Sequence, residues 1–210
     1  RDLTLAVAQR LLGEQTLGSR LTLGVVIQAY LCDTGPALEP FLEEVSRQGR
    51  CLSVRLVKGA YCDYEVTQAK QHGWAIPVSL QKWQTDQAFE RLTRRLLMAG
   101  EHVDVAIGSH NVRSVAHAMA VVETVGLPKQ ACEFQFLYGM GEAMHQAVRD
   151  MGWPVRIYTP LGELIPGMAY LVRRLLENTA NESFLRQDLW GQVSVEELLR
   201  PPGPVGEDGD

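Results

Sequence analysis

Short apolar runs alternate along this chain with longer segments whose apolar residues recur at helical spacing. The runs are mostly continuous rather than alternating, which is typical of buried strands in a parallel sheet covered on both faces. They comprise residues 24–30, Leu52–Val57, Val103–Gly108, Cys132–Leu137 and Val155–Tyr158. The order of strands and helices predicts a parallel α/β architecture.

Helices are predicted between these strands from their start and stop residues. The first covers 36–48, with Thr34 before it and Gly49 after it, and the second covers 86–99, with Thr85 as its cap and Gly100 after it. The third follows Ser114 and ends before Gly126, and the fourth covers 142–150. The last helix contains Arg173 and Arg174. Residues 64–71 add a short helix in a long connection. Residues 187–210 form a tail or linker, and residues 201–210, rich in Pro, Gly and acidic residues, are predicted to be disordered.

The composition is that of an ordinary soluble globular protein, with 46% hydrophobic and 21% charged residues in 210. A net charge of −5 without a basic stripe gives no reason to expect a nucleic acid partner. No apolar run approaches the roughly 20 residues of a membrane span, and the first residues read as a chain entered in its middle. The four cysteines lack zinc-like spacing, which indicates no metal site and favours a reducing, cytosolic compartment.

Polar and aromatic residues gather where each predicted strand ends. The set comprises Gln28, Tyr30, Lys58, Gly59, Ala60, Tyr61, His110, Asn111, Gln135, Tyr138 and Tyr158, with Arg55 inside the second strand. In (β/α) barrels the active site is built at the carboxyl ends of the strands. Five separate elements would therefore direct their polar groups to one place.

Each of these residues also has a purely structural interpretation, which the local sequence leaves open. Arg55 suits a structural ion pair or an anionic or electron-rich ligand, and Lys58 suits a solvated loop or a ligand contact. Asn111 can cap the next helix, which would leave His110 a core imidazole. The buried amide of Gln135 needs either a side chain of a neighbouring strand or the edge of a heterocyclic cofactor.

Two adjacent guanidinium groups, those of Arg173 and Arg174, interrupt an apolar helical run. Adjacent helix residues point roughly 100° apart, so both arginines cannot simply lie on one solvated face. An arginine pair is suited to hold a carboxylate in bidentate fashion. The alternative is an amphipathic helix whose arginines reach water, with Tyr158 and Tyr170 as packing residues.

Together these strings resemble the proline dehydrogenase family, and most closely the proline dehydrogenase domain of the bacterial bifunctional proline utilization enzymes. They are LVKGAY at 56–61, SHN at 109–111, EFQ at 133–135 with GMGE at 139–142, RIYTPLG at 156–162 and YLVRRLLEN at 170–178. The resemblance implies a distorted (βα)8 TIM-type barrel that carries FAD. Residues 1–186 would form its C-terminal part, with the fourth to eighth strand–helix units.

The resemblance also implies an activity. L-proline would be oxidised to Δ1-pyrroline-5-carboxylate by hydride transfer to flavin N5, and the electrons would pass to a membrane quinone. Arg173 and Arg174 would bind the proline carboxylate. Tyr158 and Tyr170 would pack against the pyrrolidine ring, and Tyr61 would line the substrate side of the site.

The same resemblance assigns residues to the cofactor. Arg55 would lie against the flavin near N5, and Glu177 would tie an arginine in place. The residues that would hold the flavin and its ribityl-phosphate arm are Gln28, Lys58, Gly59, Ala60, His110, Asn111 and Gln135. Lys82 and Thr85 would reach the adenosine half.

The chain departs from the family pattern at several points. Cys62 replaces a frequent Trp, Tyr138 a His, and Leu80 a residue with a hydroxyl group, so the adenosine-side contacts have less support than the carboxylate clamp. The first three strands, which in the family carry a lysine and an acidic residue of the site, have no counterpart. We therefore expect either a longer protein or a missing segment that is supplied separately, with an aldehyde dehydrogenase domain after the acidic tail. The protein is expected to be cytoplasmic and peripheral at the inner membrane.

Two other functions stay open at this point. One is a (β/α)-barrel lyase or aldolase in which Lys58, with a lowered pKa, forms a Schiff base. The other is a non-catalytic fragment that only packs against a partner subunit.

Overall fold

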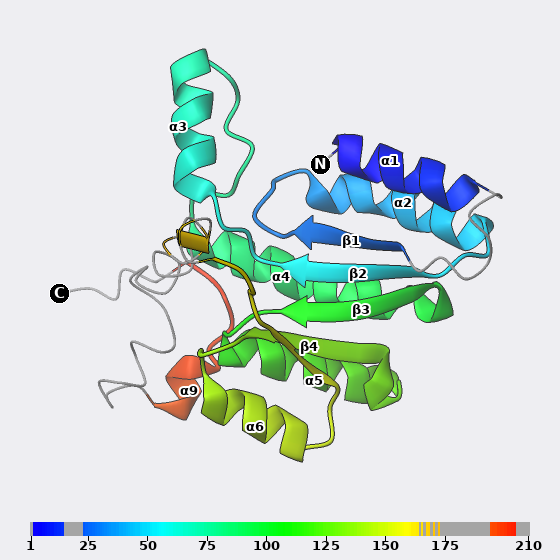
Figure 1. Cartoon of the computed structure of the whole chain (residues 1–210), viewed down its shortest axis with the longest axis vertical. Helices are drawn as coiled ribbons and strands as arrows, with labels where there is room; N and C mark the ends of the chain where they lie inside the picture. The colour runs from blue at the N-terminus through cyan, green and yellow to red at the C-terminus, as the bar shows by residue number, and fades with distance from the viewer. Residues whose placement is uncertain are drawn as a thin grey trace.

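Five parallel strands form one sheet whose spatial order follows the chain (Figure 1). The computed structural model describes residues 2–14, 23–163, 165, 167, 168, 170, 172 and 194–204. The strands are β1 (Leu23–Gln28), β2 (Leu52–Val57), β3 (Val103–Gly108), β4 (Cys132–Leu137) and β5 (Val155–Tyr158). The predicted parallel sheet is confirmed. β1 ends at Gln28 rather than at residue 30, because the chain turns there and the Thr34 hydroxyl donates to the Gln28 carbonyl at 2.8 Å.

Helices cover one face of this sheet. They are α1 (Asp2–Gly13), α2 (Thr34–Arg47), α4 (Lys82–Leu97), α5 (Val112–Val125) and α6 (Glu142–Asp150), with the short η2 (Gly100–His102) and η3 (Lys129–Ala131). In Figure 1, α1 and α2 lie beside β1, and α4 and α5 lie behind the middle strands. The helix α3 (Cys62–His72) stands away from the sheet beyond the strand ends. A last short helix is α9 (Val195–Leu198).

Burial alternates along β1 to β4, which corrects the prediction of continuous runs buried on both faces. Leu52, Val54 and Leu56 of β2 are fully buried, whereas the residues between them are only partly buried. β4 follows the same pattern. The buried set packs against the helices in one core, and we call this the helix face. The other set carries polar side chains, and we call it the inner face. It stays partly open in the described part of the chain, where Val26 is 50% exposed.

Four helices begin earlier than predicted, including α2 at Thr34 and α3 at Cys62. α4 starts at Lys82 and α5 at Val112, so Thr85 and Ser114 lie inside helices rather than before them. The side-chain oxygen of Asn111 accepts the backbone N–H of Ser114 at 2.9 Å, which makes Asn111 the N-cap of α5. The misplaced starts of α4 and α5 arose because Thr and Ser are common N-cap residues, and both occur within the first turn of these helices.

The helix α1 was not predicted. Leu5, Ala8 and Leu12 are buried and recur at the spacing of one helix face, and α1 packs on α2 and β1. This periodicity was the available signal. No helix within the described residues is long and apolar enough to span a membrane.

Candidate functional site

The parallel register brings the carboxyl ends of all five strands to one edge of the sheet. Gln28 pairs with Val57, Val57 with Gly108, and Gly108 with Gln135. Leu137 pairs with Tyr158 at the far end. Residues that directly follow these strands, including Lys58 and His110, therefore lie along the same edge.

Lys58 is held by a carboxylate that the sequence analysis did not select. Its Nζ lies 2.5 Å from Oδ1 of Asp86, whose Oδ2 lies 2.8 Å from Nζ of Lys82. Burial lowers the pKa of Lys58, and the Asp86 carboxylate opposes this shift. Burial alone would raise the pKa of Asp86, but the Lys58 ammonium and its hydrogen bond outweigh burial and lower it. Each group thus favours the charged form of the other across this contact.

The loop after β2 depends on a glycine. Gly59 has φ +125°, and a Cβ atom at this position would lie 2.3 Å from Cδ1 of Tyr30. The ring of Tyr30 is buried, and burial raises its pKa to about 12. The Tyr30 backbone N–H donates to the Lys58 carbonyl at 2.8 Å, which ties this loop to the end of β1. Ala60 and Tyr61 follow, with Tyr61 40% exposed.

Arg55 lies on the inner face in the middle of the sheet. Its Nε is buried and has no hydrogen-bond partner in the structure. A Cβ on Gly108 of the neighbouring strand would lie 3.1 Å from this atom, so the absence of a side chain there makes room for the guanidinium group. The structural ion pair considered for Arg55 is not among the ion pairs of the described residues. A buried N–H without an acceptor suits an electron-rich ligand.

Beyond Arg55, three further side chains of the inner face are joined by hydrogen bonds. The Gln135 amide donates to Oε1 of Glu133 at 2.7 Å, and Arg156 donates to Oε2 of Glu133 at 2.8 Å. The partner of the Gln135 amide thus lies two residues away on its own strand, rather than on a neighbouring strand as one of the alternatives expected. Glu133 and Arg156 were not selected from the sequence, although both lie on the inner-face side of their strands.

His110 and Asn111 both have structural partners. The Leu137 backbone N–H donates to Nε2 of His110 at 3.0 Å, so this nitrogen carries no proton. The rings of His110 and His145 lie 5.6 and 4.5 Å from that of Phe136. Asn111 caps α5. The structural interpretation of this dipeptide therefore holds, and any contact with a cofactor stays a prediction.

The substrate side is described only in part. The rings of Tyr158 and Tyr170 lie 5.9 Å apart and are tilted by 43°. Tyr158 is 48% exposed at the end of β5. Arg173, Arg174 and Glu177 lie outside the described residues. The structure thus brings the two tyrosines together, and the arginine clamp stays a prediction.

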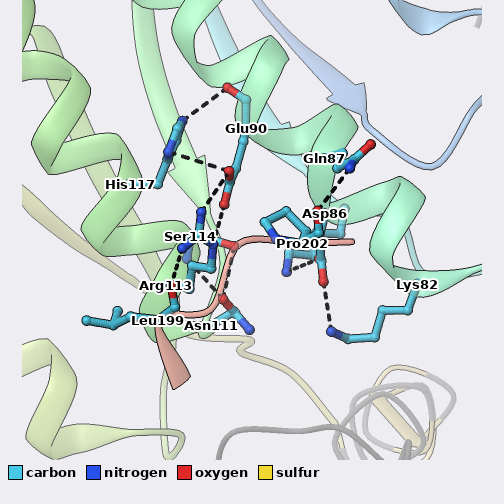
Figure 2. A network of polar contacts seen from close by, with 11 residues as sticks. Lys82, Asp86, Gln87, Glu90, Asn111, Arg113, Ser114, His117, Leu199 and Pro202 are labelled. Carbon is cyan, nitrogen blue, oxygen red and sulfur yellow. Dashed lines mark hydrogen bonds and ion pairs between the residues drawn. The ribbon is translucent and has the colours of Figure 1, made fainter. Parts of the chain in front are cut away.

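Part of the predicted tail lies on α4 and α5, as Figure 2 shows. Gln87 donates to the Pro202 carbonyl at 2.9 Å, and Arg113 donates to the Leu199 carbonyl. Arg113 also donates to Oε1 of Glu90 at 2.7 Å. Leu199 and Pro202 of the predicted tail thus contact these helices, and the disorder expected for residues 201–210 stays a prediction. Half-buried Thr85 lies in the first turn of α4, beside this network.

The described residues offer no group of three or more His, Cys, Asp or Glu side chains that could hold a metal ion. The four cysteines are free, and only Cys132 is fully buried. The polar groups of the site are cationic, amide and phenolic groups along one edge and one face of the sheet, with the carboxylates of Asp86 and Glu133 as their partners. They are suited to bind and orient an anionic or heterocyclic ligand.

Comparison with known proteins identifies relatives. A family model described as "Proline dehydrogenase" matches residues 1–187. "Bifunctional protein PutA" of Salmonella typhimurium is 33% identical over 208 residues, which are 96% of this chain and 16% of that protein. Human "Hydroxyproline dehydrogenase" is 31% identical over 178 residues, which are 79% of this chain and 39% of that protein.

A solved structure is also similar. Proline utilization A from Bdellovibrio bacteriovorus, inactivated by N-propargylglycine, superimposes with a TM-score of 0.91 at 45% identity. The match covers 96% of this chain and 21% of that one. The chain therefore spans only a minor part of the length of these relatives.

Proposed function

The chain belongs to the proline dehydrogenase family, and on that premise we propose that it supplies five strand–helix units of an FAD-dependent proline dehydrogenase. The parallel sheet with helices on one face is consistent with a partial TIM-type barrel, as in the similar PutA structure. L-proline would be oxidised to Δ1-pyrroline-5-carboxylate. The observation that carries this proposal is the unpartnered buried Nε of Arg55 on a polar inner face.

The residues present fit FAD. Arg55 offers a buried donor without an acceptor, and Gly59 and Gly108 leave room that a Cβ would fill. Lys58 and Lys82 offer positive charge at the strand ends, which suits the diphosphate of a dinucleotide. We propose that Gln28, Ala60, His110, Asn111, Gln135 and Thr85 complete the cofactor site. When bound, FAD supplies the hydride acceptor, and the protein supplies orientation and electrostatics.

On the substrate side, the chain's own residues would orient proline. Tyr158 and Tyr170 present two rings 5.9 Å apart, which suits the packing of a five-membered apolar ring. Arg173 and Arg174 would hold the proline carboxylate, and Glu177 would hold an arginine in place. Tyr61 would line the substrate side of the site. Fixing the substrate against the acceptor converts binding energy into correct orientation.

The Schiff-base alternative for Lys58 has less support. Burial lowers the pKa of Lys58, as such chemistry would require, but its ammonium group is engaged by Asp86 at 2.5 Å. The family match favours a dehydrogenase over a lyase. The non-catalytic alternative predicts no flavin and is tested below.

We further propose the cellular setting that the relatives suggest. The similarity to bifunctional PutA proteins supports a longer polypeptide with an aldehyde dehydrogenase domain. The protein would be cytoplasmic and peripheral at the inner membrane, where a quinone would receive the electrons.

An anaerobic titration of the full-length protein with L-proline tests the proposal. We expect flavin absorbance in the purified protein and its bleaching by L-proline. A parallel titration with 4-hydroxy-L-proline would show which of the two substrates reacts at lower concentration. Flavin absence would overturn the proposal and favour the lyase or the non-catalytic alternative.

A variant separates substrate binding from cofactor binding. Arg174→Met is expected to weaken proline use at least tenfold, about the loss of one charged hydrogen bond, and to leave flavin content unchanged. The exposed Arg91 on α4 gives the matched control Arg91→Met, which should change neither. Lost flavin with unchanged proline affinity in Arg174→Met would show that Arg174 does not clamp the substrate.

A further inference from the structure

The carboxylate of Asp86 lies between two lysines from different parts of the chain. Oδ1 is 2.5 Å from Nζ of Lys58, in the loop after β2, and Oδ2 is 2.8 Å from Nζ of Lys82, in the first turn of α4. Figure 2 shows the Lys82 contact. Each carboxylate oxygen holds one ammonium group, so the three side chains together keep one net positive charge.

The Lys58 contact is largely shielded from water. The side chains of Lys58 and Asp86 are 22% and 17% exposed, and Nζ of Lys58 lies 5.7 Å from the centre of the Phe89 ring. A lysine in such a place requires a partner of opposite charge to stay ionised. Asp86 supplies that charge from the next helix, across 28 positions of the sequence.

We propose that Asp86 is a positioning residue that orients the ammonium groups of Lys58 and Lys82 toward an anionic group of the bound dinucleotide. The inference rests on the proposed function, since it takes FAD as the ligand. Asp86 itself would not touch the cofactor, because like charges repel. Its effect is to order two flexible side chains before binding, which removes part of the entropic cost of binding.

The test measures the dissociation constant of FAD for the full-length protein and its variants by quenching of flavin fluorescence. Asp86→Asn keeps the shape of the side chain and removes its charge. We expect its dissociation constant to rise about tenfold or more, the scale of a lost hydrogen bond to a charged group. Asp86→Glu keeps the charge and should recover part of the affinity.

A matched control uses the same substitution on the surface. Asp150 lies at the exposed end of α6, where it accepts from Gln146 at 2.7 Å. Asp150→Asn should bind FAD as the wild type does. Equal affinity in Asp86→Asn and Asp150→Asn would overturn the inference.

Two further readouts separate positioning from folding. In a Lys82→Met background, Asp86→Asn should weaken FAD binding less than in the wild type, because one of its two contacts is already gone. In Asp86→Asn alone, FAD binding should weaken at a lower pH than in the wild type as the pH rises, because burial lowers the pKa of Lys58 and the opposing carboxylate is then absent. The charged groups that act on Lys58 are Asp86, Lys82 and Glu90. If the effects of Asp86→Asn and Lys82→Met on FAD affinity simply add, and FAD affinity in Asp86→Asn does not weaken at a lower pH than in the wild type, the role of Asp86 is merely structural.

The outcomes distinguish this inference from the proposed function. If the wild type binds FAD and Asp86→Asn behaves as the control, only the role of Asp86 fails. If the wild type binds no FAD, the proposed function fails, and this inference fails with it. If Asp86→Asn does not fold, Asp86→Glu replaces it in the test. Its carboxylate is one methylene longer and would hold the two lysines less accurately. Full FAD affinity in Asp86→Glu, both alone and in the Lys82→Met background, would therefore contradict the positioning role.

Discussion

The two faces of the sheet differ in what their residues contact. On the helix face, Phe134 and Phe136 are at most 1% exposed, and the Phe134 ring packs edge-on against Trp153 at 5.6 Å. On the inner face, the neighbouring Gln135 is only partly buried and bonds to Glu133. Residues one position apart on the same strand thus serve different purposes. The helix face supplies the stability of the fold, and the inner face presents the polar groups that we assign to the cofactor.

This division explains how a site can be rich in costly groups. A buried guanidinium nitrogen without a partner lowers stability, and the inner face carries one at Arg55. The apolar contacts on the opposite face of the same strands offset that cost. Substitutions on the two faces should therefore separate stability from cofactor binding.

The largest effect is expected on the helix face. Phe134→Ala would leave a cavity beside Trp153 and should lower the free energy of unfolding by about 3–5 kcal/mol. Gln135→Ala, the matched change on the inner face, removes one hydrogen bond and should cost about 1 kcal/mol. Urea unfolding of both variants measures the difference. Equal losses would contradict the division between the two faces.

The next largest loss of stability is expected in the loop after β2. Gly59→Ala would place a Cβ 2.3 Å from the Tyr30 ring at φ +125°. We expect a loss of stability of about 1–3 kcal/mol from backbone strain and weaker FAD binding, because Lys58 would move. Thermal unfolding and flavin content measure both.

Gly35→Ala is the control for this glycine. A Cβ at Gly35 would meet no atom within 4 Å, and it lies in the first turn of α2. Its stability should stay the same or rise slightly, since alanine favours a helix over glycine. A comparable loss in both variants would show that the Tyr30 contact does not restrict the loop.

A smaller effect is expected at the cap of α5. Asn111→Ala removes the acceptor of the Ser114 backbone N–H and should cost about 1 kcal/mol. Asn111→Asp keeps an acceptor at the same place and should retain most of the stability. If Asn111→Asp kept stability but lost FAD affinity, Asn111 would serve both the fold and the cofactor site.

The smallest effect is a pH dependence of the helix layer. Burial lowers the pKa of His145, against the influence of Glu142, so the unfolded chain binds the proton more readily than the folded one. Stability from this group is present above its ordinary pKa of 6.5 and is lost as the pH falls below it. His145→Phe keeps the ring beside Phe136 and should reduce the loss between pH 7.5 and about 5.5 in thermal unfolding.

The prediction from sequence was strongest for the strands and weaker for helix ends. Four of the strands have the predicted bounds, because each is a short run of β-branched, aliphatic or aromatic residues flanked by turn residues. The starts of α4 and α5 were displaced, since Thr85 and Ser114 look like caps although the chain is already helical there. The alternation in LSVRLV and CEFQFL was present in the sequence and predicts one open face, but it was interpreted as continuous burial.

By itself, the sequence determined the order of strands and helices and the strings that resemble the proline dehydrogenase family. It did so because turn residues, helical spacing and motifs are local properties of the chain. Only the tertiary structure decided that Arg55 lies over Gly108 and that Asp86 joins Lys58 to Lys82. These contacts join residues far apart in sequence, and they depend on the register of parallel strands and on how α4 packs against them.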